Sequence, residues 1–276
     1  MKSSYYKYFA ALLLFGSNGI VASNINLPSY EIVLLRLLLG SLFLITVFTV
    51  SRQRFTFYRN KHTCLYLFIS ASAMGASWML LYEAYQQVGI SIASLAYYCG
   101  PVIVMILSPF LFRETLTWPK IAGFLTVLAG MCLVNLQALD EGKTIWGLFC
   151  GLMSAFMYAL MVTANKKAKP ESGLENSLLQ LVIGSFIVVA FVSMQKNFVL
   201  SLTTIDWIPV LLLGLLNTGI GCYLYFSSIT DLPVQTVAIC GYLEPLSAVV
   251  FSVLFLHEVL LPLQMLGAVL ILGGAI

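Results

Sequence analysis

The sequence has very little charge. Of its 276 residues, 9% are Asp, Glu, Lys or Arg, whereas 60% are hydrophobic. A soluble domain carries about 25% charged residues, and a soluble fold of this length has too little interior to bury so much apolar surface. Lipid accepts apolar surface, provided that the backbone satisfies its own hydrogen bonds. The shortage of charge therefore predicts a membrane protein.

The sequence also lacks the signatures of metal, redox and nucleotide chemistry. Its six cysteines lie in apolar runs without CxxC or Cys/His spacing, and His62 and His257 are far apart at the ends of such runs. No GxxxxGK[ST] loop occurs. We therefore expect no metal, no cofactor, no nucleic-acid partner and no enzymatic activity. The cysteines are expected to be small packing residues.

Ten apolar runs have about the length that a spanning helix needs, roughly 20 residues. They cover residues 4–24, 29–51, 64–86, 90–112, 117–137, 144–164, 174–194, 206–229, 233–256 and 259–276. Turn-forming and charged residues separate them. The first run follows Lys2 and Lys7 as a signal peptide would, but the runs that follow make it the first transmembrane helix. We expect an all-α membrane protein of ten transmembrane helices.

The loop charges predict the orientation, because cytoplasmic loops are enriched in Lys and Arg. With the N-terminus inside, the outer side receives only Lys143 and Lys196. The cytoplasmic side receives Lys2, Lys7, Arg52, Arg54, Arg59, Lys61, Arg113, Lys120, Lys166, Lys167 and Lys169. We therefore expect an N-in/C-in protein of the cytoplasmic membrane.

Two stretches of the chain match at a constant offset of 144 residues. They are GPVIVMILSPFLFRETLTWPKIAGFLTVLAGM from Gly100 and EPLSAVVFSVLFLHEVLLPLQMLGAVLILGGA from Glu244. The paired positions are Pro101 with Pro245, Glu114 with Glu258, Leu116 with Leu260, Gly123 with Gly267, and Gly130 with Gly274. We expect two five-helix repeats, residues 1–138 and 139–276. Because five is odd, the second repeat enters the membrane from the opposite side, as in inverted-repeat secondary transporters.

These residues carry a family resemblance. The pattern Pro101…Glu114-Thr115-Leu116…Gly123…Gly130, its second copy from Glu244-Pro245, and Arg36 in the second helix resemble the EamA type of the drug/metabolite transporter superfamily. The resemblance implies a ten-helix N-in/C-in fold with a central cavity between two halves. It also implies transport, often export, of amino acids, related metabolites or drugs. Without a nucleotide-binding motif, the energy would come from gradients.

Glu244 is the most informative candidate for solute binding. It lies near the middle of the ninth span, and its counterpart in the first repeat is Gly100, so symmetry does not require it. A charge at this depth costs roughly 3 kcal/mol and needs a partner or water. Pro245 has no amide hydrogen and is expected to free the carbonyl of Gly241. Glu244 therefore suits an amine, a proton or a cation, or is a structural carboxylate paired with a hydroxyl or Arg36.

The third span ends in an aromatic run with a carboxylate. Trp78, Tyr82 and Tyr85 share a helix face, and Glu83 points elsewhere. Aromatic faces with a carboxylate can hold a cationic or aromatic solute. The alternative is an aromatic belt at the outer interface, with Glu83 reaching water.

Proline-bearing helices occur at matching positions in both halves. The fourth span carries Tyr97, Tyr98 and Pro101, and Tyr242 of the ninth span corresponds to Tyr98. Such paired interruptions point to a binding site, although a packing kink filled by tyrosines is the alternative.

Arg36 is expected either to meet a solute carboxylate or to pair with Glu31 or Glu83. Asn18 and Tyr223 are weaker polar candidates, because polar groups inside a bundle often only join helices.

Three functions remain open. The first is a gradient-driven exporter of amino acids or similar metabolites that uses protons or another coupling ion. The second is a transporter of quaternary amines or cationic drugs, for which aromatic and carboxylate groups would suit. The third is a non-transporting scaffold or assembly subunit. Partners are expected to be a small solute and membrane lipid, with the chain a monomer or homodimer.

Overall fold

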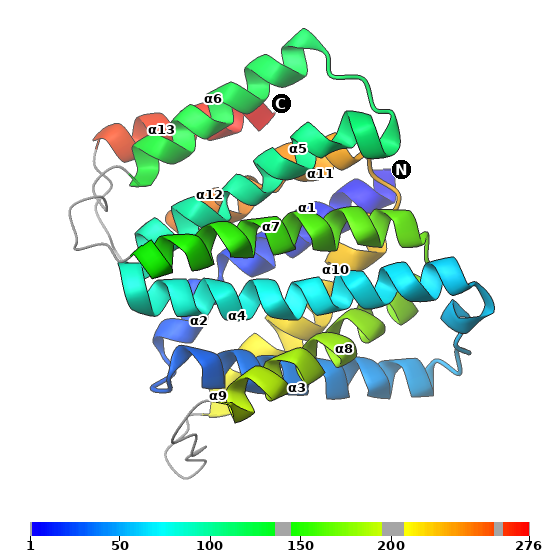
Figure 1. Ribbon diagram of the computed structural model, residues 1–276. Coiled ribbons are helices and arrows are strands. Elements are labelled where there is room, and N and C mark those ends of the chain that lie inside the picture. The colour runs from blue at the N-terminus through cyan, green and yellow to red at the C-terminus, as the bar shows by residue number, and fades with distance from the viewer. Residues whose placement is uncertain (1, 136–144, 195–206, 257–261, 276) are drawn as a thin grey trace.

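A computed structural model describes residues 2–135, 145–194, 207–256 and 262–275. These residues form helices and short connections, and the described part of the chain contains no strand. In Figure 1 the helices lie side by side in layers, with most connections at the two ends of the bundle.

The helices follow the predicted runs closely in the first half of the chain. They are α1 (Lys2–Gly16), α2 (Asn18–Ser23), α3 (Ser29–Val50), the short η1 (Phe57–Arg59), α4 (Lys61–Tyr97), α5 (Cys99–Phe112) and α6 (Trp118–Asn135). The predicted break between the third and fourth runs, residues 87–89, lies inside α4. That break contains Gly89 but no proline, and a single glycine is tolerated inside a helix.

The second half begins with α7 (Ile145–Ala168) and α8 (Gly173–Ser193). The eighth run is divided among α9 (Trp207–Leu211), the π-helical segment η4 (Leu212–Ile220) and α10 (Gly221–Ser228). The ninth run forms α11 (Val234–Cys240) and α12 (Leu243–Leu256), and α13 (Pro262–Ala275) follows. The π-helical segment was not expected, whereas the break between α11 and α12 falls where the sequence predicted an interruption of the ninth span before Pro245.

Six segments of the described chain are long and apolar enough to cross a membrane. They are Tyr30–Val50, Lys61–Val88, Ile145–Ala168, Gly173–Ser193, Trp207–Ser228 and Val234–Phe255. The shorter apolar helix Cys99–Phe112 accompanies them. The expectation of an all-α, multi-pass membrane protein is therefore confirmed, whereas the number ten stays a prediction.

Local chemistry explains where several helices begin and end. Pro28 and Pro233 precede α3 and α11, where a fixed φ is favourable and the missing amide is not needed. The side chain of Asn60 caps α4 by accepting the amide of His62. Arg113 ends α5 in a left-handed conformation, with a φ of 57°.

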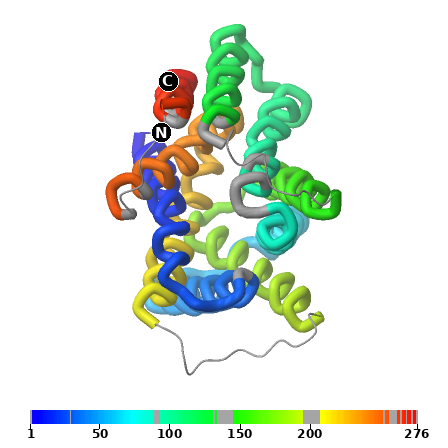
Figure 2. Tube along the Cα trace, turned by 90° about the vertical axis from the view of Figure 1, so that its left-hand side faces the viewer, coloured from blue at the N-terminus to red at the C-terminus, as the bar shows by residue number. Residues whose placement is uncertain are grey.

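Helices α6 and α13 pack against each other at one edge of the bundle (Figures 1 and 2). The contact depends on glycine. A methyl carbon built on Gly123 would lie 2.7 Å from the carbonyl oxygen of Gly274, and one on Gly130 would lie 2.6 Å from that of Gly267. Without a hydrophobic driving force in lipid, such close backbone approach supplies the packing energy.

The other helices form the body of the bundle. Helix α4 packs along α7 and α8, α3 packs on α8 and η4, and α1 packs on α10 and α12. Polar pairs join some of these helices. Ser77 donates to the carbonyl of Ser154 at 2.9 Å, and Ser154 donates back to that of Ser77 at 2.7 Å. Both hydroxyls are thereby satisfied away from water.

Gly130→Val is expected to lower the free energy of unfolding by roughly 1–3 kcal/mol, because the added side chain overpacks the contact of α6 with α13. Thermal melting of the purified protein in detergent measures this. Gly273→Val is the control, because a carbon built at Gly273 meets nothing within 4 Å. Equal melting temperatures for the two variants would contradict the packing argument.

Candidate functional site

A cavity of about 560 Å³ lies inside the bundle. Its lining residues come from α1 and α2, α3, α4, α7, α10 and α12, and thus from both halves of the chain. It extends to the end of the bundle where α2 connects to α3, since Ser23, Ile25 and Leu27 also line it. Pockets for small solutes have this size. Helices α6 and α13 contribute no described residue to the lining.

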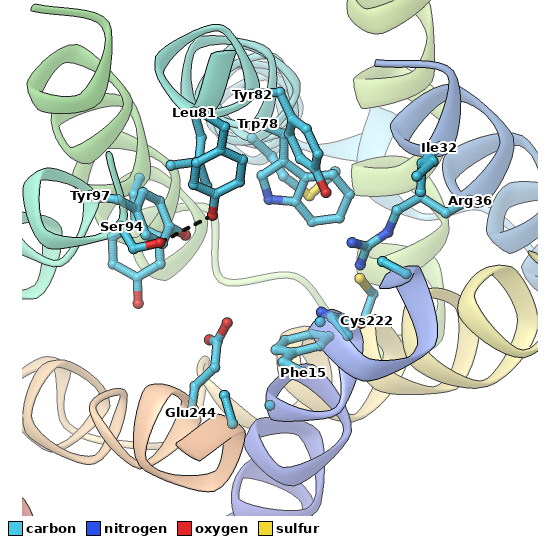
Figure 3. Close-up of a pocket in the computed structure, with 18 of the residues that line it drawn as sticks. Phe15, Ile32, Arg36, Trp78, Leu81, Tyr82, Ser94, Tyr97, Cys222 and Glu244 are labelled. Carbon is cyan, nitrogen blue, oxygen red and sulfur yellow. Dashed lines mark hydrogen bonds between the residues drawn. The ribbon is translucent and has the colours of Figure 1, made fainter. Parts of the chain in front are cut away.

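Arg36 of α3 presents a guanidinium to the cavity from one side (Figure 3). The residue is only 6% exposed. Its Nε donates to Thr218 Oγ1 at 2.8 Å, and its Cζ lies 4.6 Å from the centre of the Trp78 ring. Neither Glu31 nor Glu83 is among the partners that the described residues provide. A hydroxyl and an aromatic face therefore hold this cation without neutralising it.

Glu244 lies in the first turn of α12, and Figure 3 shows its carboxylate pointing into the same cavity. The described residues provide no hydrogen bond or ion pair to that carboxylate. The carbonyl of Gly241 is not freed as we expected, because it accepts the amide of Glu244 at 3.2 Å. Between α11 and α12 the chain instead makes one tight turn from Gly241 to Glu244, and α12 begins in this turn.

Aromatic rings form much of the remaining wall. Trp78 and Tyr82 lie together on one side in Figure 3. Farther along, the ring centres of Tyr97 and Tyr158 are 5.5 Å apart, and the hydroxyls of Tyr158 and Tyr225 are 3.3 Å apart. Tyrosines offer both apolar faces and hydrogen-bonding hydroxyls. The wall can therefore contact apolar and polar parts of one solute.

The cavity brings together most of the residues predicted from sequence. Those that line it are Asn18, Arg36, Trp78, Tyr82, Tyr97, Tyr98 and Glu244. The side chain of Asn18 also accepts a hydrogen bond from the side-chain amide of Asn217 at 3.0 Å. Ionisable residues within apolar spans were thus a usable signal, because such residues are costly in lipid, and the aromatic residues near them were a second one.

Three other candidates lie outside the lining. Glu83 accepts the indole N–H of Trp146 at 3.3 Å and the side-chain amide of Gln87 at 3.2 Å. Tyr242 is fully buried and donates to the carbonyl of Tyr98 at 2.7 Å. The ring centre of Tyr223 lies 5.8 Å from Lys7 Nζ.

The two candidate prolines also lie outside the lining. Pro101 and Pro245 occupy the first turns of α5 and α12. A first turn accommodates proline without breaking an established helix. They therefore mark where helices restart beside the cavity, rather than kinks inside continuous helices.

Several lining residues were missed by the sequence reasoning. They are Phe15, Ser94, Tyr158, Cys222 and Tyr225, together with apolar residues such as Met74. Tyr158 and Tyr225 lie within apolar runs, and the signal that found Tyr97 applied to them as well. Phe15 and Cys222 carried no such signal, because they are ordinary residues of a packed membrane helix.

The opposite end of the bundle is closed by hydrogen bonds between distant segments. The carboxylate of Glu114 accepts the amides of Val234 at 2.8 Å and Gln235 at 3.0 Å. The side chain of Gln235 in turn donates to Ser108 at 2.9 Å and accepts from Lys120 at 2.6 Å. A carboxylate at a helix N-terminus is favourable for both its charge and its acceptor geometry. These bonds join α5 and α6 to the start of α11.

Helix α1 is joined to the same region at this end. Tyr8 donates to the carbonyl of Val237 at 2.8 Å, and Ser4 donates to Asp231 at 2.8 Å. Lys166 of α7 donates to the carbonyls of Thr230 and Leu232. Specific polar contacts therefore join the helices at this end of the bundle, away from the residues that line the cavity.

Within the described residues, no three His, Cys, Asp or Glu side chains come close enough to hold a metal ion. The chemistry available in the cavity is thus that of a guanidinium, a carboxylate, tyrosine hydroxyls and aromatic faces.

The sequence pattern of the EamA-like transporter family matches the chain twice, over residues 3–136 and 145–276. The uncharacterized transporter YxxF of Bacillus subtilis is 27% identical over 275 residues, covering 97% of this chain and 86% of that protein. The threonine/homoserine exporter RhtA of Escherichia coli is 27% identical over 234 residues, covering 84% of this chain and 76% of that protein.

A solved structure, titled only as a crystal structure of a protein, superposes with a TM-score of 0.82 at 18% identity. It covers 100% of this chain and 96% of that chain. At this identity the likeness shows a shared fold alone.

Ser94→Cys, in a chain whose native cysteines are replaced, is expected to react with a small water-soluble thiol reagent, because Ser94 lines the cavity. Ser154→Cys is the matched control, because Ser154 is fully buried between α4 and α7. The modified fraction, measured by mass spectrometry in the folded protein, checks this. Equal protection of the two cysteines would show that water does not enter the cavity.

Proposed function

Because the chain belongs to the EamA-like transporter family, we propose that it is a secondary transporter that exports amino acids or closely related metabolites across the cytoplasmic membrane. Family membership makes the chain a multi-pass membrane transporter and not an enzyme. One observation carries the finer proposal. A buried guanidinium and a carboxylate, neither neutralised by an ion pair among the described residues, face one cavity (Figure 3).

Two opposite charges on one cavity suit a solute with two opposite charges. Arg36 offers N–H donors to a carboxylate, and Glu244 offers acceptors to an ammonium group. The aromatic wall would contact the part of the solute between its carboxylate and its ammonium group, and its side chain. The threonine/homoserine exporter of Escherichia coli, similar over most of this chain, supports the choice of amino acids.

Cationic amines or drugs are the second candidate, and the tyrosines and Trp78 with Glu244 favour them. The same cavity contains the cation of Arg36, however, and Trp78 already lies against that guanidinium. A like charge inside a poorly solvated cavity is unfavourable. This arrangement supports a zwitterion over a solute with net positive charge.

Transport by alternating access would follow from two inverted five-helix repeats, residues 1–138 and 139–276. The glycine contacts support this arrangement. Gly123 and Gly130 correspond to Gly267 and Gly274 in the repeat, yet Gly123 meets Gly274 and Gly130 meets Gly267. Reciprocal contacts of this kind are typical of a two-fold relation. They also run in opposite directions along α6 and α13, as an inverted repeat requires.

The distribution of Lys and Arg supports a cytoplasmic position for the closed end of the bundle and for both termini. The cavity would then face outward in this state. Glu114 would hold the cytoplasmic side closed, and its repeat partner Glu258, which lies outside the described residues, would act on the other side.

In proteoliposomes, the protein is expected to carry labelled threonine or another zwitterionic amino acid down an imposed gradient. Glu244→Gln is expected to reduce this flux about tenfold or more, because the charge-assisted contact with the ammonium group is lost. Flux per folded protein is the measurement.

Glu83→Gln is the matched control, since it removes the same charge from a carboxylate outside the cavity. It is expected to leave flux near wild type. If the wild-type protein carries labelled choline but no zwitterion, the amino-acid proposal is contradicted. Unchanged flux in Glu244→Gln would remove this residue from the mechanism.

Glu114→Gln is expected to loosen the closed end, because the backbone amides of Val234 and Gln235 lose a charged acceptor. The shift is expected to be about 1–2 kcal/mol, or about tenfold in the ratio of the two states. It is measured as a faster reaction of Ser108→Cys with a thiol reagent in a chain without native cysteines. The exposed Glu171→Gln at the same end is the control, and equal rates in both variants would show that Glu114 does not hold the closed state.

A further inference from the structure

We propose that Thr218 is a positioning residue that orients the guanidinium of Arg36 and thereby sets the selectivity of the cavity for carboxylate-bearing solutes. This inference rests on the proposed function and deepens it. Thr218 does not line the cavity itself. It acts through Arg36, and the π-helical segment η4 gives its hydroxyl the direction that this requires.

The hydroxyl of Thr218 follows an unusual pattern. It donates to the carbonyl of Leu213, five residues back, at 2.8 Å. Threonines in regular helices of this chain donate four residues back, as Thr46 does to Leu42 and Thr126 does to Ala122, both at 2.8 Å. The wider turn of η4 accounts for the difference, and π-helical turns are frequent at functional sites.

This donation determines what Thr218 can do for Arg36. A hydroxyl has one proton and two lone pairs. Because its proton is donated to Leu213, Oγ1 can only accept from α3. It accepts a hydrogen bond from Nε of Arg36 at 2.8 Å. Thr218 is fully buried, and Arg36 is 6% exposed. A buried hydrogen bond to a charged group is among the stronger ones in a protein.

The guanidinium is therefore held at two places. Thr218 takes the Nε edge, and Trp78 covers one face at 4.6 Å. A carboxylate can bind a guanidinium along the edge that includes Nε or along the edge of the two terminal nitrogens. Because Nε is occupied, the terminal edge remains, and Figure 3 shows it turned to the cavity. A planar carboxylate matches two parallel N–H donors, whereas an ester or amide does not.

The backbone fixes the distance between the two residues. A methyl carbon built on Gly40, one turn after Arg36 on α3, would lie 2.9 Å from the Thr218 methyl group and 3.2 Å from the carbonyl oxygen of Gly214. Helix α3 and η4 thus pack at backbone contact. The neighbouring Asn217 donates to the carbonyl of Leu14 and to Ser17, both at 2.8 Å, at the break between α1 and α2. The segment η4 is thus held by α3 and by the break between α1 and α2.

The test compares a carboxylate with its ester. Labelled L-threonine is transported into proteoliposomes while unlabelled L-threonine or its methyl ester competes. The wild-type protein is expected to prefer the amino acid over the ester. Thr218→Val removes the hydroxyl at equal size and is expected to reduce that preference about five- to tenfold, because Nε loses its partner and the guanidinium turns. The maximal rate is expected to change less than the preference.

Two variants separate positioning from folding. Thr218→Ser keeps the hydroxyl and is expected to restore the preference. Thr46→Val, on the same helix as Arg36 but exposed, is the control for removing a threonine hydroxyl from a membrane helix and is expected to behave as wild type. If Thr218→Val does not fold, Thr218→Ala removes the hydroxyl without added bulk. A merely structural role would lower folded yield and leave the preference unchanged.

The outcomes distinguish the two proposals. If the wild-type protein carries no amino acid, the proposed function fails and Thr218 loses its role with it. If Arg36→Gln abolishes the preference while Thr218→Val keeps it in folded protein, the proposed function stands and the inference about Thr218 is overturned. Loss of preference in both variants, with recovery in Thr218→Ser, supports the inference.

Discussion

The absence of water in the bilayer interior governs how every polar group of this chain is placed. Inside lipid, an unsatisfied polar group costs several kcal/mol. Most polar side chains therefore meet partners within the bundle. Asn165 and Asn176 exchange amide hydrogen bonds at 2.9 and 3.1 Å, and Gln180 donates to Ser70 at 3.0 Å. Against this background, Arg36 and Glu244 stand out, because they face the cavity without an ion pair among the described residues.

The cavity owes its polarity to a departure from the internal repeat. A methyl carbon built on Gly100 would lie 2.7 Å from the Tyr158 ring and 3.2 Å from the carbonyl oxygen of Ala155, so α5 and α7 leave no space there. At the corresponding position, Glu244 faces the cavity instead. In the first half this position is a glycine packed on the Tyr158 ring of the second half, whereas in the second half it is a carboxylate that faces the cavity.

The two ends of the bundle differ for the same physical reason. At the closed end, charged groups lie against backbone groups that need partners. Glu114 accepts two amides at the start of α11, and Lys166 donates to carbonyls at the end of α10. These charge-assisted bonds are strong in a poorly solvated region.

The amino-acid order alone determined that this is a multi-pass helical membrane protein, because apolar runs of spanning length leave no other solvent than lipid. Most of the candidate residues chosen from it line the cavity, since a charge within such a run is costly enough to be informative. The amino-acid order could not assign Glu83 to a contact with Trp146, nor separate Tyr242 from the lining, because which face of a helix meets the cavity depends on packing. Only the tertiary structure decided that Arg36 is held by Thr218 rather than by a carboxylate. That bond joins residues 182 positions apart through a π-helical turn, and no local sequence pattern specifies where such a turn places its hydroxyl.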